Sequence, residues 1–142
     1  MSKKDFLKSI SDTCRVNREF KDKLIARYDY LLKDNEYLQS ATNSFKLIDI
    51  LANIDYLSYP DIVQHPDGWF TLIWEGDIYG NYISFEFLQD NLVKIINVKD
   101  GGILSKKMFS IHGLEQHRVP LCMLGELADS QALKQYLFGV NI

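Results

Sequence analysis

One stretch of the chain, residues 65–98, constrains the fold more than any other, because it holds three short apolar runs separated by turn-forming residues. The runs cover residues 69–74, 81–88 and 92–98. They are rich in aromatic and β-branched residues, and the second run alternates apolar and polar side chains, as a half-buried strand does. We therefore predict three consecutive antiparallel strands, which the segments on either side must cover.

Alternation along the first two runs predicts which face of the sheet is covered. Both faces of the first run carry apolar side chains, so we expect its strand to lie centrally. Helices from either side of the stretch are expected to pack on the face that carries the largest apolar residues. These residues are Phe70, Leu72, Trp74, Ile83, Phe85 and Phe87.

Turn chemistry predicts where the strands end. Asp90 and Asn91 can hold the positive φ angles of a type I′ turn, and Gly68 can hold one after Pro66. The sequence Lys-Asp-Gly-Gly at residues 99–102 ends the third strand. Two further strands are expected, an edge strand at residues 61–63 and a fourth strand of the meander at residues 103–111.

Helical spacing marks the segments that flank the sheet. Residues 3–34 carry apolar side chains three or four positions apart, which indicates a helix. The register slips near Asn17, so the segment forms either one bent helix or two, with Asn17 as the cap of the second. A further helix is predicted to begin at the cap Thr42 and to end before Pro60. A last helix is predicted at residues 120–139, with proline in its first turn.

Length and composition favour one domain. The chain has 142 residues, of which 46% are hydrophobic and 25% charged, as in ordinary globular proteins. We expect a single α+β domain over residues 1–142, with N-terminal helices, a three- to five-stranded antiparallel meander sheet and a C-terminal helix. No run approaches the roughly 18 apolar residues of a membrane helix. Residues 1–12 lack the apolar core of a signal peptide, so we expect a cytoplasmic protein without membrane contact. Two cysteines are too few for a disulfide framework, which agrees with a reducing compartment.

Charge is unevenly distributed along the chain. Residues 1–33 carry nine Lys/Arg against five Asp/Glu, residues 34–104 carry three against eleven, and residues 105–142 carry four against three. The central segment therefore has a net charge of −8 within a total of −3. Such a surface either keeps the protein in solution or meets a basic partner, since complementary charge speeds encounter. Phosphates would be repelled, which disfavours nucleic acid as the partner, while a homo-oligomer remains compatible with the sequence.

Residues 45–97 follow a pattern that also occurs elsewhere. A helix ending in small and leucine-like residues is followed by an apolar couplet, a Pro-Asp-Gly turn, a strand ending in Trp and an alternating strand. The residues that carry the pattern are Leu51, Ala52, Ile62, Val63, Pro66, Asp67, Gly68, Leu72, Trp74, Ile83, Phe85 and Phe87. In this pattern the chain resembles a loose group of small, mostly uncharacterised bacterial proteins. The resemblance implies an α+β fold and no established catalytic residues.

The sequence offers little that argues for an enzyme. It contains no GxGxxG, GxxxxGK[ST], HExxH, GxSxG or CxxC motif, so we assign no catalytic residue, metal ligand or cofactor. Cys122, with His112 or His117 as base, could form a nucleophile in the first turn of the last helix, but a thiol among leucines is more often a core residue. His65 beside Asp67 could be a base with an orienting carboxylate, although such clusters at turns usually serve as caps.

The leading hypothesis is a non-enzymatic protein-binding module, of the antitoxin, immunity or phage-encoded inhibitor kind, with an acidic face against a basic partner. The residues assigned to this face are Asp61, Asp67, Glu75, Asp77, Tyr79 and Glu86. The alternative is a small-molecule binder or hydrolase with a pocket near His65, Trp69, Trp74 and Cys122. A deep pocket with convergent polar groups would favour the alternative, and an open acidic surface would favour the module.

Overall fold

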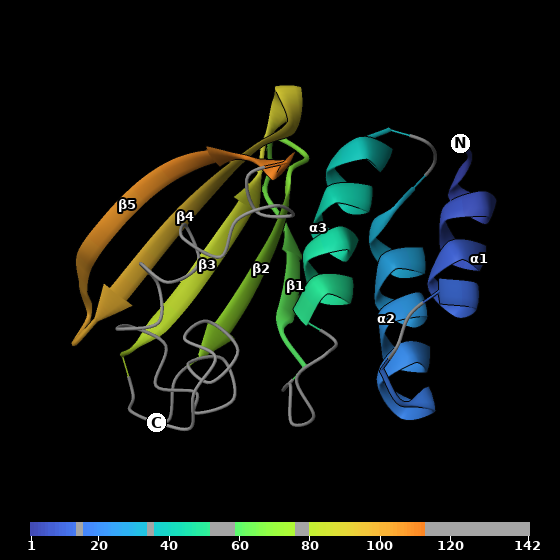
Figure 1. Ribbon diagram of the computed structural model, residues 1–142, viewed down its shortest axis with the longest axis horizontal. Helices are drawn as coiled ribbons and strands as arrows, with labels where there is room; N and C mark the ends of the chain where they lie inside the picture. Colours follow the sequence, from blue (N-terminus) through green and yellow to red (C-terminus); the bar gives the residue numbers. More distant parts are fainter. Residues whose placement is uncertain (14–15, 34–35, 52–58, 76–79, 113–142) are drawn as a thin grey trace.

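The computed structural model describes residues 1–13, 16–33, 36–51, 59–75 and 80–112. Within these residues three α-helices precede a five-stranded antiparallel sheet (Figure 1), which confirms the α+β class. The helices are α1 (Lys3–Thr13), α2 (Arg18–Leu31) and α3 (Leu38–Leu51). The strands are β1 (Asp61–Gln64), β2 (Phe70–Glu75), β3 (Tyr82–Phe87), β4 (Leu92–Lys99) and β5 (Gly102–Ser110), with the short 3₁₀ turn η1 (Gln89–Asn91) between β3 and β4. The predicted C-terminal helix lies outside the described residues.

Each strand of the sheet pairs with the next strand in the chain, in the order β1-β2-β3-β4-β5. The three strands predicted for residues 65–98 are β2, β3 and β4, and β1 and β5 extend the sheet beyond them on both sides. The predicted edge strand at residues 61–63 is confirmed as β1, and β2 has a neighbour on either side, as expected. The register places Leu72 opposite Phe85 and Phe85 opposite Ile95, which aligns the apolar positions of three strands.

Two of the predicted turns have the backbone geometry that their residues suggested. Gly68 has a φ of 100°, and the His65 N–H donates to the Trp69 carbonyl at 2.8 Å to close the β1–β2 turn. Asp90 and Asn91 have φ angles of 60° and 58°, the pair of positive values that a type I′ turn requires.

The N-terminal region forms two helices, which resolves the question that spacing left open. Asn17 caps α2, since its side chain accepts a hydrogen bond from the Phe20 N–H at 2.9 Å. Reciprocal bonds also cap α1: the Ser2 hydroxyl accepts from the Asp5 N–H at 3.1 Å, and the Asp5 carboxylate accepts from the Ser2 N–H at 3.2 Å. This is a capping box, in which two backbone donors at a helix start are satisfied.

The predicted start of the third helix at Thr42 is wrong, because α3 already begins at Leu38. The Thr42 hydroxyl donates to the Leu38 carbonyl at 2.7 Å, a bond made inside a helix. The first turn of α3 contains the polar residues Gln39 and Ser40, so the sequence has no apolar pattern there. Ser40 is nevertheless buried and hydrogen-bonded to two strands. Its hydroxyl accepts from the Phe70 N–H at 2.8 Å and donates to the Phe87 carbonyl at 2.6 Å.

The core lies between the helices and one face of the sheet. All six apolar residues predicted for the covered face of β2 and β3 are buried. Tyr28 of α2 packs on Phe70 with ring centroids 5.6 Å apart, and its hydroxyl lies 2.7 Å from that of Ser44 in α3. Phe6 of α1 meets Tyr28 edge to face at 5.1 Å, so three helices and the sheet share one apolar cluster.

The outer edge of β1 is covered by α2. The guanidinium Nε of Arg27 donates to the Ile62 carbonyl at 2.8 Å. This bond satisfies a backbone acceptor on the edge strand that no strand of the described sheet reaches.

Among the described residues, no helix combines the length and the apolar character needed to cross a membrane.

Candidate functional site

The candidate site is the face of the sheet opposite the helix-covered core, which we call the open face. It carries a shallow hollow of about 400 Å³. The residues that line this open-face hollow are Asp61, Val63, His65, Thr71, Ile73, Glu75, Tyr82, Ser84, Glu86 and Ile96. These described lining residues include three carboxylates and no Lys or Arg, so the hollow is acidic.

Strand register brings these side chains together. Asp61 pairs with Ile73, Ile73 with Ser84, and Ser84 with Ile96, so one row crosses β1 to β4. Because side chains alternate between faces along each strand, the neighbouring rows repeat the same face two residues away. The Thr71–Glu86 pair and the Glu75–Tyr82 pair belong to these rows. Three carboxylates from three strands therefore point to the same side of the sheet.

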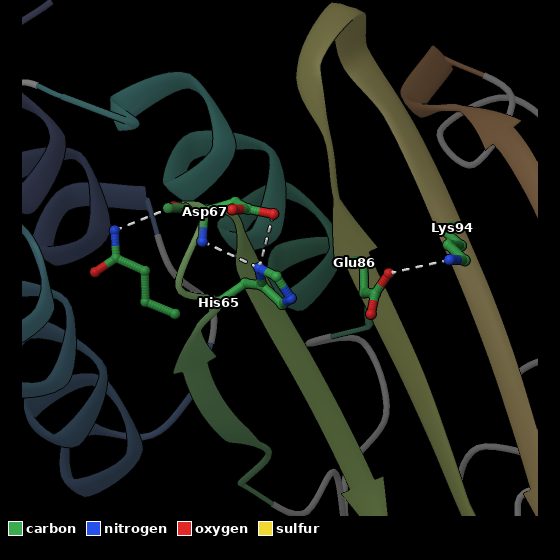
Figure 2. Close-up of polar contacts among 6 residues, drawn as sticks. His65, Asp67, Glu86 and Lys94 are labelled. Atoms are coloured by element: carbon green, nitrogen blue, oxygen red, sulfur yellow. Dashed lines mark hydrogen bonds and ion pairs between the residues drawn. The ribbon is translucent and has the colours of Figure 1, made fainter.

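The positive charges of the open face gather on the other half of the sheet. Lys94 of β4 lies with its Nζ 3.9 Å from the Glu86 carboxylate, which Figure 2 shows across β3 and β4. Lys106 of β5 follows beside it, and the neighbouring Lys94 amine lowers the pKa of Lys106. The open face is thus acidic over β1–β3 and basic over β4–β5.

His65 and Asp67 meet in the β1–β2 turn (Figure 2). The Asp67 backbone N–H donates to His65 Nδ1 at 3.1 Å, and an Asp67 carboxylate oxygen lies 3.4 Å from the same nitrogen. A ring that accepts this backbone bond at Nδ1 holds its proton on Nε2 when it is neutral. The contact therefore organises the turn at the rim of the open-face hollow.

The structure brings together half of the residues predicted for partner binding. Asp61, Glu75 and Glu86 line one hollow, whereas Asp67 is exposed in the adjoining turn. Asp77 and Tyr79 lie outside the described residues. Tyr82, a tyrosine near a strand end that was not assigned to the acidic face, lies opposite Glu75 with 36% of its surface exposed. Its place two residues before Ser84 and four before Glu86, on the polar face of the alternation, was the available signal.

The residues predicted for the alternative pocket do not share one cavity where the structure describes them. His65 lines the open-face hollow, Trp69 lines a different pocket near the start of α3, and Trp74 is 4% exposed in the core. Cys122 lies outside the described residues. In the part of the chain that is described, no group of three or more His, Cys, Asp or Glu side chains could hold a metal ion.

Comparison with known proteins leaves the site to be interpreted from its own chemistry. No family model matches the chain, and neither a curated protein nor a solved structure matches it.

Proposed function

We propose that the protein is a non-enzymatic binding module whose open face takes a basic partner protein, as an antitoxin, immunity protein or phage-encoded inhibitor would. One observation carries the proposal: Asp61, Glu75 and Glu86, from three different strands, surround a hollow whose described lining has no Lys or Arg. A Lys or Arg side chain of a partner could enter this hollow and exchange water for carboxylate contacts.

The apolar part of the hollow suits a protein rather than a small ion. Val63 is 37% exposed and Tyr82 is 36% exposed, and Ile73 and Ile96 are partly buried beside them. A long basic side chain lays its methylene groups on such a surface while its charged end reaches the carboxylates. An exposed tyrosine at the rim adds the kind of anchor that often contributes most to binding energy.

The amines of β4 and β5 would fix the orientation of the partner. A basic surface that covered Lys94 and Lys106 would meet like charge, and such contacts are unfavourable. The partner's basic groups are therefore expected over β1–β3, with neutral or acidic groups over β4–β5.

The test begins with recovery of a partner by the full-length chain from extracts of the organism that encodes it. The purified partner is then measured against the chain carrying Asp61→Lys with Glu75→Lys. A matched control carries Asp12→Lys with Asp22→Lys, which changes the net charge equally on α1 and α2, where both carboxylates are exposed.

We expect the open-face variant to slow association at least about tenfold and the control to change it less than about twofold, since steering depends on local complementarity. Association of the wild-type chain should also slow as salt is raised. Equal rates for the two double variants, or a partner whose contact surface is not basic, would overturn the proposal.

A further inference from the structure

A second pocket, separate from the open face, lies where the start of α3 meets the β1–β2 and β3–β4 turns. Its volume is about 320 Å³. We call it the turn pocket, and it is lined by Tyr37, Gln39, Ser40, Trp69, Leu88, Gln89, Asp90 and Asn91. This volume lies within the range of small-molecule sites.

Two aromatic side chains form one corner of the turn pocket. The rings of Tyr37 and Trp69 meet edge to face, with centroids 6.1 Å apart and planes at 84°. Both residues are only partly buried. Tyr37 also has a φ of 61°, a conformation that costs energy for a residue with a side chain.

Contacts outside the turn pocket hold its walls in place. Gly68 lies so close to the Tyr37 ring that a Cβ on Gly68 would overlap it. Across the pocket, the Asn43 amide donates to Asn91 Oδ1 at 3.0 Å, and Gln39 donates to Asn43 Oδ1 at 3.0 Å. A site held in this way loses little entropy when a ligand enters.

Several polar groups in the turn pocket are left for a ligand. Gln89 and Asp90 are exposed and Trp69 is partly buried at this pocket, and within the described part of the chain their side chains have no protein hydrogen-bond partner. Together they offer both donors and acceptors. The described lining contains one carboxylate and no Lys or Arg, so an anionic ligand such as a nucleotide or phosphate is disfavoured.

We infer that the turn pocket binds a neutral saccharide. Sugar hydroxyls both donate and accept hydrogen bonds, which matches the mixture of amide, indole and carboxylate groups. The C–H face of a sugar ring carries small positive charges, which the negative face of an aromatic ring attracts. An organic cation could use the aromatic rings and Asp90, but it would leave the indole and amide N–H groups without acceptors.

The two tryptophans of the chain provide a direct test by NMR. Glucose, galactose and N-acetylglucosamine are titrated separately into the ¹⁵N-labelled full-length protein, and choline serves as the cationic probe. The indole N–H signal of Trp69 is identified with Trp69→Phe. Trp74, 4% exposed in the core, supplies an internal reference for intact folding.

We expect at least one of the three sugars to shift the Trp69 signal saturably, with a dissociation constant on the order of 1 mM, and to leave the Trp74 signal in place. Asp90→Asn keeps a residue that tolerates positive φ and should weaken binding about fivefold. Asp100→Asn, in the β4–β5 turn at a φ of 54°, is the matched control and should not change it. The inference is wrong if none of the three sugars shifts Trp69, if choline shifts it more than any sugar at equal concentration, or if both Asn variants weaken binding equally.

Discussion

The ring of Tyr37 lies directly against Gly68, and the two residues join the start of α3 to the β1–β2 turn. Gly68 has a φ of 100°, which a side chain tolerates poorly. Gly68→Ala should therefore add a steric overlap to an unfavourable backbone conformation. We expect it to lower the free energy of unfolding by about 3 kcal/mol, measured by urea denaturation.

Gly101→Ala separates the two effects. Gly101 has a φ of 79°, but a Cβ there would meet no atom within 4 Å. This variant should lose only about 1 kcal/mol. Similar losses in both variants would mean that the Tyr37 contact is relieved without cost.

Ser40 connects α3 to two strands through one buried hydroxyl group. Ser40→Ala would leave the Phe70 N–H and the Phe87 carbonyl without this partner, so we expect a loss of about 2–4 kcal/mol in urea unfolding. Thr42→Ala is the control, because the Thr42 hydroxyl bonds only within its own helix and its loss should cost less than about 0.5 kcal/mol. A small loss for Ser40→Ala would contradict the bridging role.

Two buried asparagines, one on β4 and one directly before β3, should respond to substitution with opposite signs. Asn97 is 0% exposed and neither side-chain polar atom has a partner in the described residues. Leucine has the same branching and no polar atom to bury, so Asn97→Leu should stabilise the protein by about 1 kcal/mol.

Asn81 provides the comparison, because its Oδ1 accepts from the Asp100 N–H at 2.7 Å. Asn81→Leu should destabilise by about 2 kcal/mol, since it leaves that donor unpaired. Thermal unfolding of both variants measures the change in stability. A loss of stability for Asn97→Leu as large as that for Asn81→Leu would contradict the prediction.

The capping box of α1 should make stability depend on pH in the acid range. Bonds from the backbone and side chain of Ser2 lower the pKa of Asp5 below its usual 3.8. A carboxyl group whose pKa is lowered by folding stabilises the folded state above its unfolded pKa, and this contribution is lost as the pH falls through the folded pKa. The stability difference between the wild type and Asp5→Asn should therefore persist at neutral pH and shrink below pH 3.8. Urea unfolding at a series of pH values checks this, and a difference that does not change with pH would refute it.

Local chemistry in the sequence predicted the parts of the fold that depend on neighbouring residues. Asn17 caps a helix and Gly68 takes a positive φ because each acts within a few residues of itself. The start of α3 was missed because Ser40 is a polar residue in a buried position. Its hydroxyl is satisfied by hydrogen bonds to β2 and β3, about 30 and 47 residues away in the chain. A polar residue gives no local sign of such distant partners.

The candidate site was predicted only in part, for a similar reason. Strand parity placed Glu86 on the polar face, but only the register of pairing shows that Asp61 and Glu75 surround the same hollow. The net charge of a segment also hid the division of the open face, since Lys94 was counted in the same acidic sum. The summed charge of a sequence segment does not show on which strand, or on which face of the sheet, each charged side chain lies.

The bond from Arg27 to the Ile62 carbonyl has a consequence for solubility. An edge strand with free carbonyl groups can pair with the edge of another molecule and start aggregation. Arg27 occupies one of these acceptors and places a positive charge at the edge of β1. A chain with Arg27→Met could fold normally and still precipitate on concentration, because molecules could then join through their β1 strands.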